Sequence, residues 1–183
     1  MPNIAVVGCG GRAGALLDSM QEVRDREYLW GEYYSPSRLD AYHAHAAEVP
    51  WWAESVADLH PRVTALFDPD PTAVDAFAER CRAAGDDPET FTDWERFLAS
   101  DAYDAAVVAS PNDRHVENVP PLLEAGVPVL CEKPLATTLA DHDTLVAADE
   151  ATEALCFPGL NLRSSPYFEH LRTLLGEGAV GDV

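Results

Sequence analysis

Basic residues are scarce in this chain of 183 residues, in which Lys and Arg number 12 against 32 Asp and Glu. The formal net charge is -20 at pH 7, and Lys133 is the single lysine. The acidic residues are spread along the chain and do not gather in a tail. Such a surface repels the phosphates of nucleic acids and anionic lipids. We therefore expect no nucleic-acid partner and no membrane partner.

Long apolar runs and targeting signals are also missing. No stretch approaches the length that spans a bilayer, and the start Met1-Pro2-Asn3 leads almost at once into an apolar run, without a charged-then-apolar leader. We expect a cytoplasmic protein. Because salt screens repulsion between like charges, the acidity also suggests a high-salt (halophilic) cytoplasm. This hypothesis predicts a higher melting temperature in molar salt than in low salt, and equal melting temperatures would contradict it.

Cysteine is infrequent, and its spacing indicates neither a disulfide framework nor a metal site. The four cysteines form no C-x-x-C pair, and three of them lie within or beside apolar runs, which is typical of small buried thiols. For Cys9, which lies between Gly8 and Gly10, a reactive thiol is the alternative. The four are Cys9, Cys81, Cys131 and Cys156.

The first fourteen residues contain a glycine pattern. The apolar, β-branched run Ile4–Val7 is typical of a buried parallel strand and leads directly into Gly8 and Gly10, with a helical pattern behind them. This is the G-x-G-x-x-[G/A] order of a dinucleotide fingerprint in its strand-to-helix context. Gly8 allows the tight turn, Gly10 lets the backbone approach a pyrophosphate, and Ala13 or Gly14 lets the helix lie close to the strand.

The predicted helix would begin near Gly11, and its first N–H groups and partial positive charge would face the phosphates. A glycine-rich turn without a ligand is the alternative interpretation. We favour a cofactor site, to which we assign Gly8, Gly10, Gly11, Arg12 and Ala13.

A second strand is predicted over 62–67, and it ends in Asp68. An acid at the end of this strand accepts hydrogen bonds from the adenosine ribose hydroxyls. The alternative is that Asp68 only starts the turn over 68–71. No Arg or Lys follows immediately, so the 2′-phosphate of NADP would meet acids. We therefore expect NAD as the cofactor, with NADP less favoured.

Asp68 lies far beyond the usual spacing of about 20 residues from the glycine motif. An insertion at about 29–62, rich in aromatic residues and histidine, explains the difference. Its aromatic residues would pack the insertion against the domain, and a lid or an oligomer contact is the alternative. His43 and His45 are two residues apart, so on a helix they would point in different directions. We predict no metal site.

Two later strands also end in polar residues, and ligands bind at the carboxyl ends of strands in such sheets. The run that starts at Tyr103 ends in Ser110-Pro111-Asn112, and His115 falls in the first turn of the next helix. We place Ser110, Pro111 and Asn112 where the central part of the cofactor would pass. Taken alone, His115 is more typical of a structural histidine, and a place in the cofactor site is the alternative.

The run Val127–Cys131 ends in Glu132-Lys133-Pro134. A charged pair at this edge is costly to bury without a function or a partner. Glu132 and Lys133 could pair with each other or with neighbours, but their position favours a site that includes Pro134. A lysine placed there can hold a substrate hydroxyl or carbonyl oxygen, or tune its proton transfer.

The alternation of strands and helices predicts an α/β fold with a doubly wound parallel sheet, a Rossmann fold. We expect this NAD(P)-binding domain over 1–160. Over 161–183 we expect a connecting helix and the start of a second, substrate-binding α/β domain that is missing or only begun.

These blocks together resemble the Gfo/Idh/MocA family, which includes glucose–fructose oxidoreductase and inositol dehydrogenase. Cys131–Thr137 looks like the family's E-K-P signature, which is more specific than a glycine motif. Asn161-Leu162-Arg163 followed by Pro166 looks like the stretch that leads out of the nucleotide domain. The remaining matches are Val6–Gly14, Ala109–Asn112 with His115, and Glu124-Ala125-Gly126.

The resemblance implies a two-domain NAD(P)-dependent oxidoreductase acting on a sugar, a cyclitol or a similar polyol. It implies that Lys133 is the catalytic lysine near the reacting carbon and that Glu132 and Pro134 shape the nicotinamide end. It also brings Asn161 and Arg163 into the cofactor site. Asn112 and His115 would belong to the cofactor cleft.

Members of this family continue into an open-sheet domain with an Asp/His pair used in proton transfer, whereas no histidine follows His170 here. We therefore expect a cofactor-binding half that is inactive alone. The alternatives are a non-catalytic dinucleotide-binding or sensor module that self-associates, and a Rossmann domain for another adenine-containing ligand. Each of these interpretations is compatible with a homo-oligomer.

Overall fold

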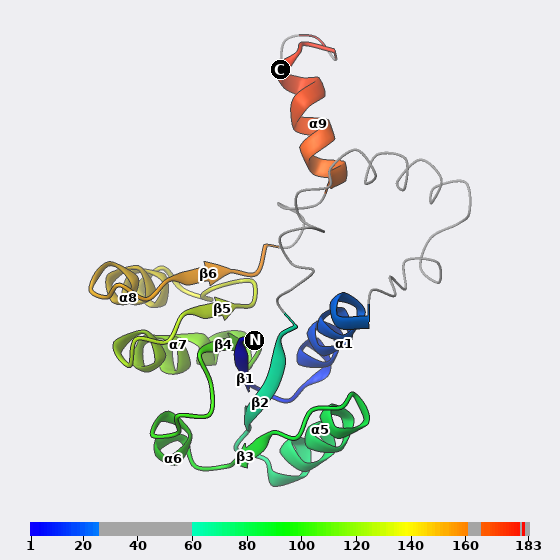
Figure 1. The fold of residues 1–183 in the computed structure, drawn as a ribbon. Coiled ribbons are helices and arrows are strands. Elements are labelled where there is room, and N and C mark those ends of the chain that lie inside the picture. Colours follow the sequence, from blue (N-terminus) through cyan, green and yellow to red (C-terminus); the bar gives the residue numbers. More distant parts are fainter. Residues whose placement is uncertain (26–59, 161–165, 180, 182–183) are drawn as a thin grey trace.

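Parallel strands form a single sheet in the order β3-β2-β1-β4-β5-β6 (Figure 1). The computed structural model describes residues 1–25, 60–160, 166–179 and 181. This order reverses direction between β1 and β4, which is the topological switch point of a Rossmann fold. The strands are β1 (Asn3–Val7), β2 (Arg62–Phe67), β3 (Glu89–Phe91), β4 (Ala105–Val108), β5 (Val129–Cys131) and β6 (Cys156–Pro158).

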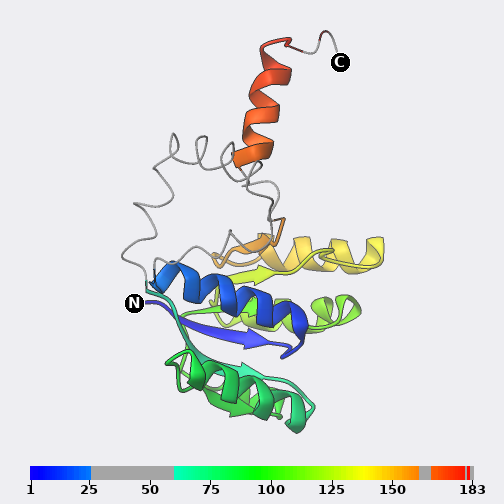
Figure 2. The same ribbon diagram turned by 90° about the vertical axis from the view of Figure 1, so that its right-hand side faces the viewer.

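Helices cover both faces of the sheet, so the doubly wound prediction is confirmed. In Figures 1 and 2, α1 and α5 lie on one face, α6, α7 and α8 lie on the other, and α9 lies away from the sheet. The helices are α1 (Gly11–Asp25), α5 (Pro71–Ala83), α6 (Trp94–Leu98), α7 (His115–Glu124), α8 (Leu139–Glu150) and α9 (Pro166–Gly176), and a 3₁₀ turn over Asn112–Arg114 precedes α7. Of the described helices, none combines the length and apolar character needed to cross a membrane.

The two faces of the sheet have separate hydrophobic cores. Along β1, Val6 packs with the residues of α1 and α5, whereas Ala5 and Val7 pack with those of α6, α7 and α8. This alternation is the two-residue period of a strand buried on both faces. The core on the face covered by α6, α7 and α8 contains Phe97, whose ring stacks on Tyr103 with centroids 5.0 Å apart.

Helix starts follow the expected capping chemistry. The side chains of Asp93 and Thr138 accept hydrogen bonds from the backbone N–H groups of Arg96 and Asp141. Asp70 caps α5 in the same way. The last strand, β6, begins at Cys156, and Ala154 just before it is buried in the core.

Some predictions fall on residues outside the described ranges. The aromatic insertion at about 29–62 lies there almost entirely, as do Asn161 and Arg163. Helix α9 matches the predicted connecting helix. The division of the chain into 1–160 and 161–183 stays a prediction.

Candidate dinucleotide site

The glycine loop, which we define as residues 8–12 after β1, lies against the end of β4, at the switch point of the sheet. Gly8 has φ +89° and donates a hydrogen bond to the carbonyl of Phe67 at 2.8 Å. A Cβ placed on Gly8 would lie 2.6 Å from Cα and N of Ser110. Glycine is therefore required here both by the backbone angle and by the close approach of two chain segments.

Gly10 and Gly11 differ from Gly8, because a Cβ at either would meet no atom within 4 Å. Packing within the described residues therefore does not require glycine at these two positions. The space above them, at the start of α1, is what a diphosphate needs to reach the backbone. The first turn of α1 contains no acidic residue, although the chain is strongly acidic overall. The residues present thus fit a dinucleotide.

The alternative between Ala13 and Gly14 is resolved by packing. Ala13 is 2% exposed and packs among the core residues on the α1 face of the sheet, so its small side chain lets the helix approach. Gly14 instead makes room for Arg80, whose guanidinium lies where a Cβ would stand. Arg80 also donates to Asp18 on α1 at 2.6 Å.

Asp68 follows β2 and turns its carboxylate toward the glycine turn. Its Oδ2 accepts a hydrogen bond from the backbone N–H of Cys9 at 2.9 Å, and its Oδ1 accepts one from Asp70 N–H at 2.9 Å. Asp68 therefore starts the turn and also lies beside the glycine loop, and its role in ribose binding stays a prediction. The hydrogen bond to Cys9 fixes the carboxylate at the edge where the ribose would lie.

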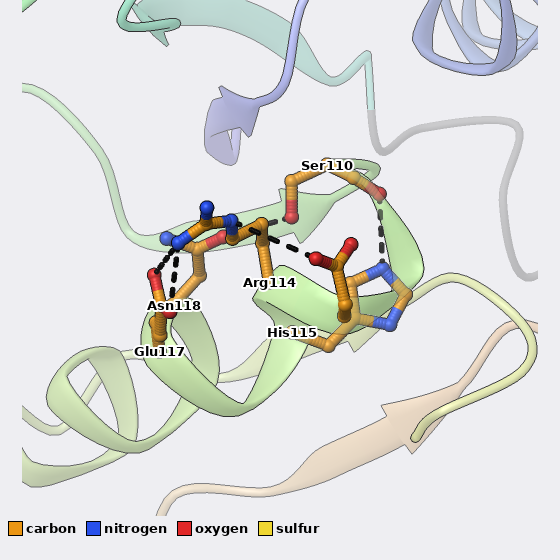
Figure 3. Close-up of polar contacts among 6 residues, drawn as sticks. Ser110, Arg114, His115, Glu117 and Asn118 are labelled. Atoms are coloured by element: carbon orange, nitrogen blue, oxygen red, sulfur yellow. Dashed lines mark hydrogen bonds and ion pairs between the residues drawn. The ribbon is translucent and has the colours of Figure 1, made fainter. Parts of the chain in front are cut away.

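The segment after β4 is braced by the start of α7 (Figure 3). The hydroxyl of Ser110 donates to the amide oxygen of Asn118 at 2.8 Å. Arg114 pairs with Glu117 at 2.8 Å on the exposed side of the same turn. Pro111 and Asn112 are exposed, so Asn112 can face a ligand. Asn118 was not predictable from local sequence, because its contact with Ser110 depends on how α7 packs against the end of β4.

His115 is fully buried and lies between two loops of the ligand edge. Its Nε2 lies 3.1 Å from the carbonyl oxygen of Ser110, and its Nδ1 lies 3.1 Å from that of Pro134 and 3.2 Å from that of Leu135. Both ring nitrogens are thus engaged by the chain itself. This geometry agrees with the structural role, in which His115 joins the two loops and does not touch the cofactor.

Glu132 is buried and pairs with the glycine loop instead of with the ammonium of Lys133. Its Oε1 lies 2.7 Å from Nε of Arg12, and its side chain is 6% exposed. Its Oε2 accepts from the backbone N–H of Lys133 at 3.2 Å. Lys133 and Pro134 are exposed, and the peptide bond between them is cis. Glu132, Lys133 and the glycine loop therefore meet at one edge of the sheet, as the strand ends predict.

Gly159, which the sequence did not single out, closes the other side of Glu132. Its N–H donates to the carbonyl of Cys131 at 2.7 Å, and a Cβ on it would lie 3.4 Å from the carboxyl carbon of Glu132. Its place just after the final strand is the signal that could have identified it, since the ends of β1, β2, β4 and β5 contribute to this edge.

The four cysteines lie in the described part of the chain and form no disulfide. Burial raises the pKa of Cys9 to about 12, helped by the nearby Asp68 carboxylate. Burial likewise raises the pKa of Cys131 to about 12 and that of Cys156 to about 11. A reactive Cys9 is not supported, because the thiolate is the nucleophile. No group of three or more His, Cys, Asp or Glu within the described ranges could hold a metal ion.

Thiol labelling at pH 8 should therefore be slow in the folded chain. A pKa about three units above that of an ordinary thiol lowers the thiolate fraction at Cys9 roughly a thousandfold. An aromatic disulfide reagent should react much faster with the chain in denaturant than with the folded chain. Because the raised pKa values favour the protonated thiols of the folded state, the free energy of unfolding should fall as pH rises from about 9 toward 12. A thiol in the folded chain that reacts as fast as in denaturant would contradict this prediction.

The sheet order, the open glycine loop and the helix start behind it define a dinucleotide-binding domain. The comparison with protein families agrees, since the model of the oxidoreductase family with an NAD-binding Rossmann fold, GFO_IDH_MocA, matches residues 2–160. The chain belongs to this family.

Known relatives are dehydrogenases of greater length. The chain is 34% identical to inositol 2-dehydrogenase of Corynebacterium glutamicum over 125 residues, which is 66% of this chain and 35% of the relative. It is 30% identical to the NADP-dependent scyllo-inositol 2-dehydrogenase of Bacillus subtilis over 120 residues. The chain thus spans about a third of the length of these relatives.

Solved structures show the same fold. An oxidoreductase of Thermotoga maritima matches with a TM-score of 0.69 at 22% identity, over 99% of this chain and 44% of that one. An oxidoreductase of Agrobacterium radiobacter, solved in complex with NAD⁺, L-tartaric acid and magnesium, matches with a TM-score of 0.65 at 18% identity, over 99% of this chain and 42% of that one.

Proposed function

We propose that this chain is the cofactor-binding part of an NAD-dependent dehydrogenase that oxidises a secondary alcohol of a cyclitol, a sugar or a similar polyol. The observation that supports the proposal is the ion pair between Arg12 and Glu132, because it joins the start of α1 to the loop that carries Lys133. NAD, when bound, supplies the hydride acceptor for such an oxidation.

The residues at the carboxyl ends of the strands would have different roles, according to their positions. The backbone N–H groups at the start of α1, near Gly10 and Gly11, would hold the diphosphate. Asp68 would accept hydrogen bonds from the ribose hydroxyls. The exposed ammonium of Lys133 would hold the hydroxyl oxygen of the substrate and stabilise negative charge that develops there as its proton leaves.

The substrate class rests on similarity, since both curated relatives described above are named as inositol dehydrogenases. Because the chain spans about a third of their length, we assign turnover to a complete protein that contains a substrate domain. In that arrangement 161–183 would lead from the cofactor domain into the substrate domain, and the chain alone would bind the dinucleotide without oxidising a polyol.

The choice between the two dinucleotides is expected to depend on Asp68. A 2′-phosphate would stand close to its carboxylate, and like charges at short range repel each other. Asp68→Asn should therefore raise the affinity for NADP relative to NAD about tenfold, a change of about 1.4 kcal/mol in relative binding free energy. Calorimetric titrations of the purified chain with NAD and with NADP measure this ratio.

Asp70→Asn is the matched control. It removes a neighbouring charge, while asparagine still caps α5. An equal change of the ratio in both variants would show a diffuse charge effect in place of recognition by Asp68. If the folded chain binds neither dinucleotide, the proposed function is wrong.

A further inference from the structure

The backbone of Lys133 is held from both sides, while its side chain is exposed. On one side, Glu132 accepts a hydrogen bond from the Lys133 N–H at 3.2 Å. On the other, the carbonyls of Pro134 and Leu135 face Nδ1 of His115 at 3.1 and 3.2 Å. The backbone that carries the Lys133 side chain is therefore held by Glu132 and His115, which are both buried.

Glu132 also connects Lys133 to the glycine loop. Its other carboxylate oxygen lies 2.7 Å from Nε of Arg12, the second residue of α1. Arg12 is the cationic partner of Glu132 among the described residues, and a buried carboxylate that loses such a partner is strongly destabilised, so the two side chains should move together. Gly159 also lies close to Glu132, because a Cβ on it would stand 3.4 Å from the carboxyl carbon.

Arg12 stands where a bound diphosphate would attract it. Its side chain is 40% exposed, and it lies in the first turn of the helix whose N-terminus would hold the phosphates. A guanidinium has several donors and binds phosphate as well as carboxylate. A diphosphate would therefore compete for the same guanidinium that holds Glu132.

We infer that occupancy of the glycine loop by a diphosphate is transmitted to Lys133 through Arg12 and Glu132, so that Glu132 is a positioning residue whose geometry responds to the cofactor. The inference rests on the proposed function, because it assigns the diphosphate to the glycine loop. The binding site and the lysine would then be coupled through the protein as well as through a shared ligand.

The single lysine makes this coupling measurable. Reductive dimethylation with ¹³C-formaldehyde labels Lys133 and the N-terminal amine only, and dimethyl-lysine keeps its positive charge. ADP is the probe, because it carries the adenosine and the diphosphate but no nicotinamide. A change of the Lys133 methyl resonance on adding ADP is therefore not caused by contact with the nicotinamide.

At saturating ADP we expect a clear shift of the Lys133 resonance in the unaltered chain, and less than half of that shift in Glu132→Gln and in Arg12→Gln. Asp18→Asn is the matched control, since it disrupts another arginine–carboxylate pair of the same helix, with Arg80, that does not reach the Lys133 loop. The control variant should keep the full shift.

Each outcome has a distinct meaning. If ADP and NAD bind but the Lys133 shift is absent, or persists in full in both variants, the coupling is wrong while the proposed function stands. If neither ADP nor NAD binds the folded chain, the proposed function fails and the coupling with it. Circular dichroism checks that each variant folds. If one of these variants fails to fold, Arg12→Lys replaces it. This substitution keeps a cation beside Glu132 but loses the guanidinium fork, and it should also reduce the Lys133 shift.

Discussion

Gly8→Ala is expected to destabilise the chain more than any other single glycine substitution in the described residues. The new Cβ would lie 2.6 Å from backbone atoms of Ser110, and φ at this position is +89°. The left-handed backbone costs roughly 1–2 kcal/mol, and overpacking against backbone adds about 1–3 kcal/mol. Since domains of this kind are stable by about 5–15 kcal/mol, the loss should be evident in a urea unfolding curve.

Gly85→Ala separates the two contributions. Gly85 has φ +85°, but a Cβ there would meet nothing within 4 Å. Its loss of stability should therefore reflect the backbone angle alone, and the larger loss at Gly8 measures the collision with Ser110. Equal losses at the two positions would mean that the β1 and β4 ends are not held in the close contact described here.

Gly10→Val should have the opposite profile, with a large effect on binding and little effect on stability. A side chain at this position has free space in the folded chain, but it would fill the approach of a diphosphate to the backbone. We expect NAD affinity to fall at least about a hundredfold, which corresponds to about 2.7 kcal/mol. Calorimetric titration measures the affinity, and the midpoint of thermal unfolding measures the stability.

Gly10→Ala provides the graded control, because a methyl group fills less of the same space. Its affinity for NAD should lie between those of the unaltered chain and Gly10→Val. If a folded Gly10→Val variant bound NAD with unchanged affinity, the proposal that the diphosphate binds at the glycine loop would be wrong.

The positions of the strands and the edge that carries the polar residues were predictable from the sequence. Ile4–Val7 and the run that ends at Ser110 are short and apolar, and parallel strands in a Rossmann fold have their carboxyl ends on one edge. This geometry alone brings Gly8, Ser110 and Lys133 to the same side of the sheet. The family resemblance then agrees with the family that the comparison identifies.

The partners of individual side chains were not predictable in the same way. The pairing of Arg12 with Glu132 depends on how α1 is tilted against β5, and local sequence does not encode that angle. The sequence left two roles open for His115, because its two ring nitrogens meet backbone carbonyls only after the loops at Ser110 and at Pro134 have come together. Glycine at position 14 is explained by the guanidinium of Arg80, which lies on a helix more than 60 residues later in the chain.

The position of β1 in the middle of the sheet also has a consequence for folding. This strand is synthesised before β2 and β4, yet Asn3 pairs with Arg62 and Ile4 with Ala105. Its hydrogen-bonding edges therefore have no partner until both later strands have left the ribosome. Closing such long loops is slow and leaves an apolar strand exposed in the meantime. The glycine turn packs directly against Ser110, so the cofactor loop can take its final shape only once β4 has paired with β1.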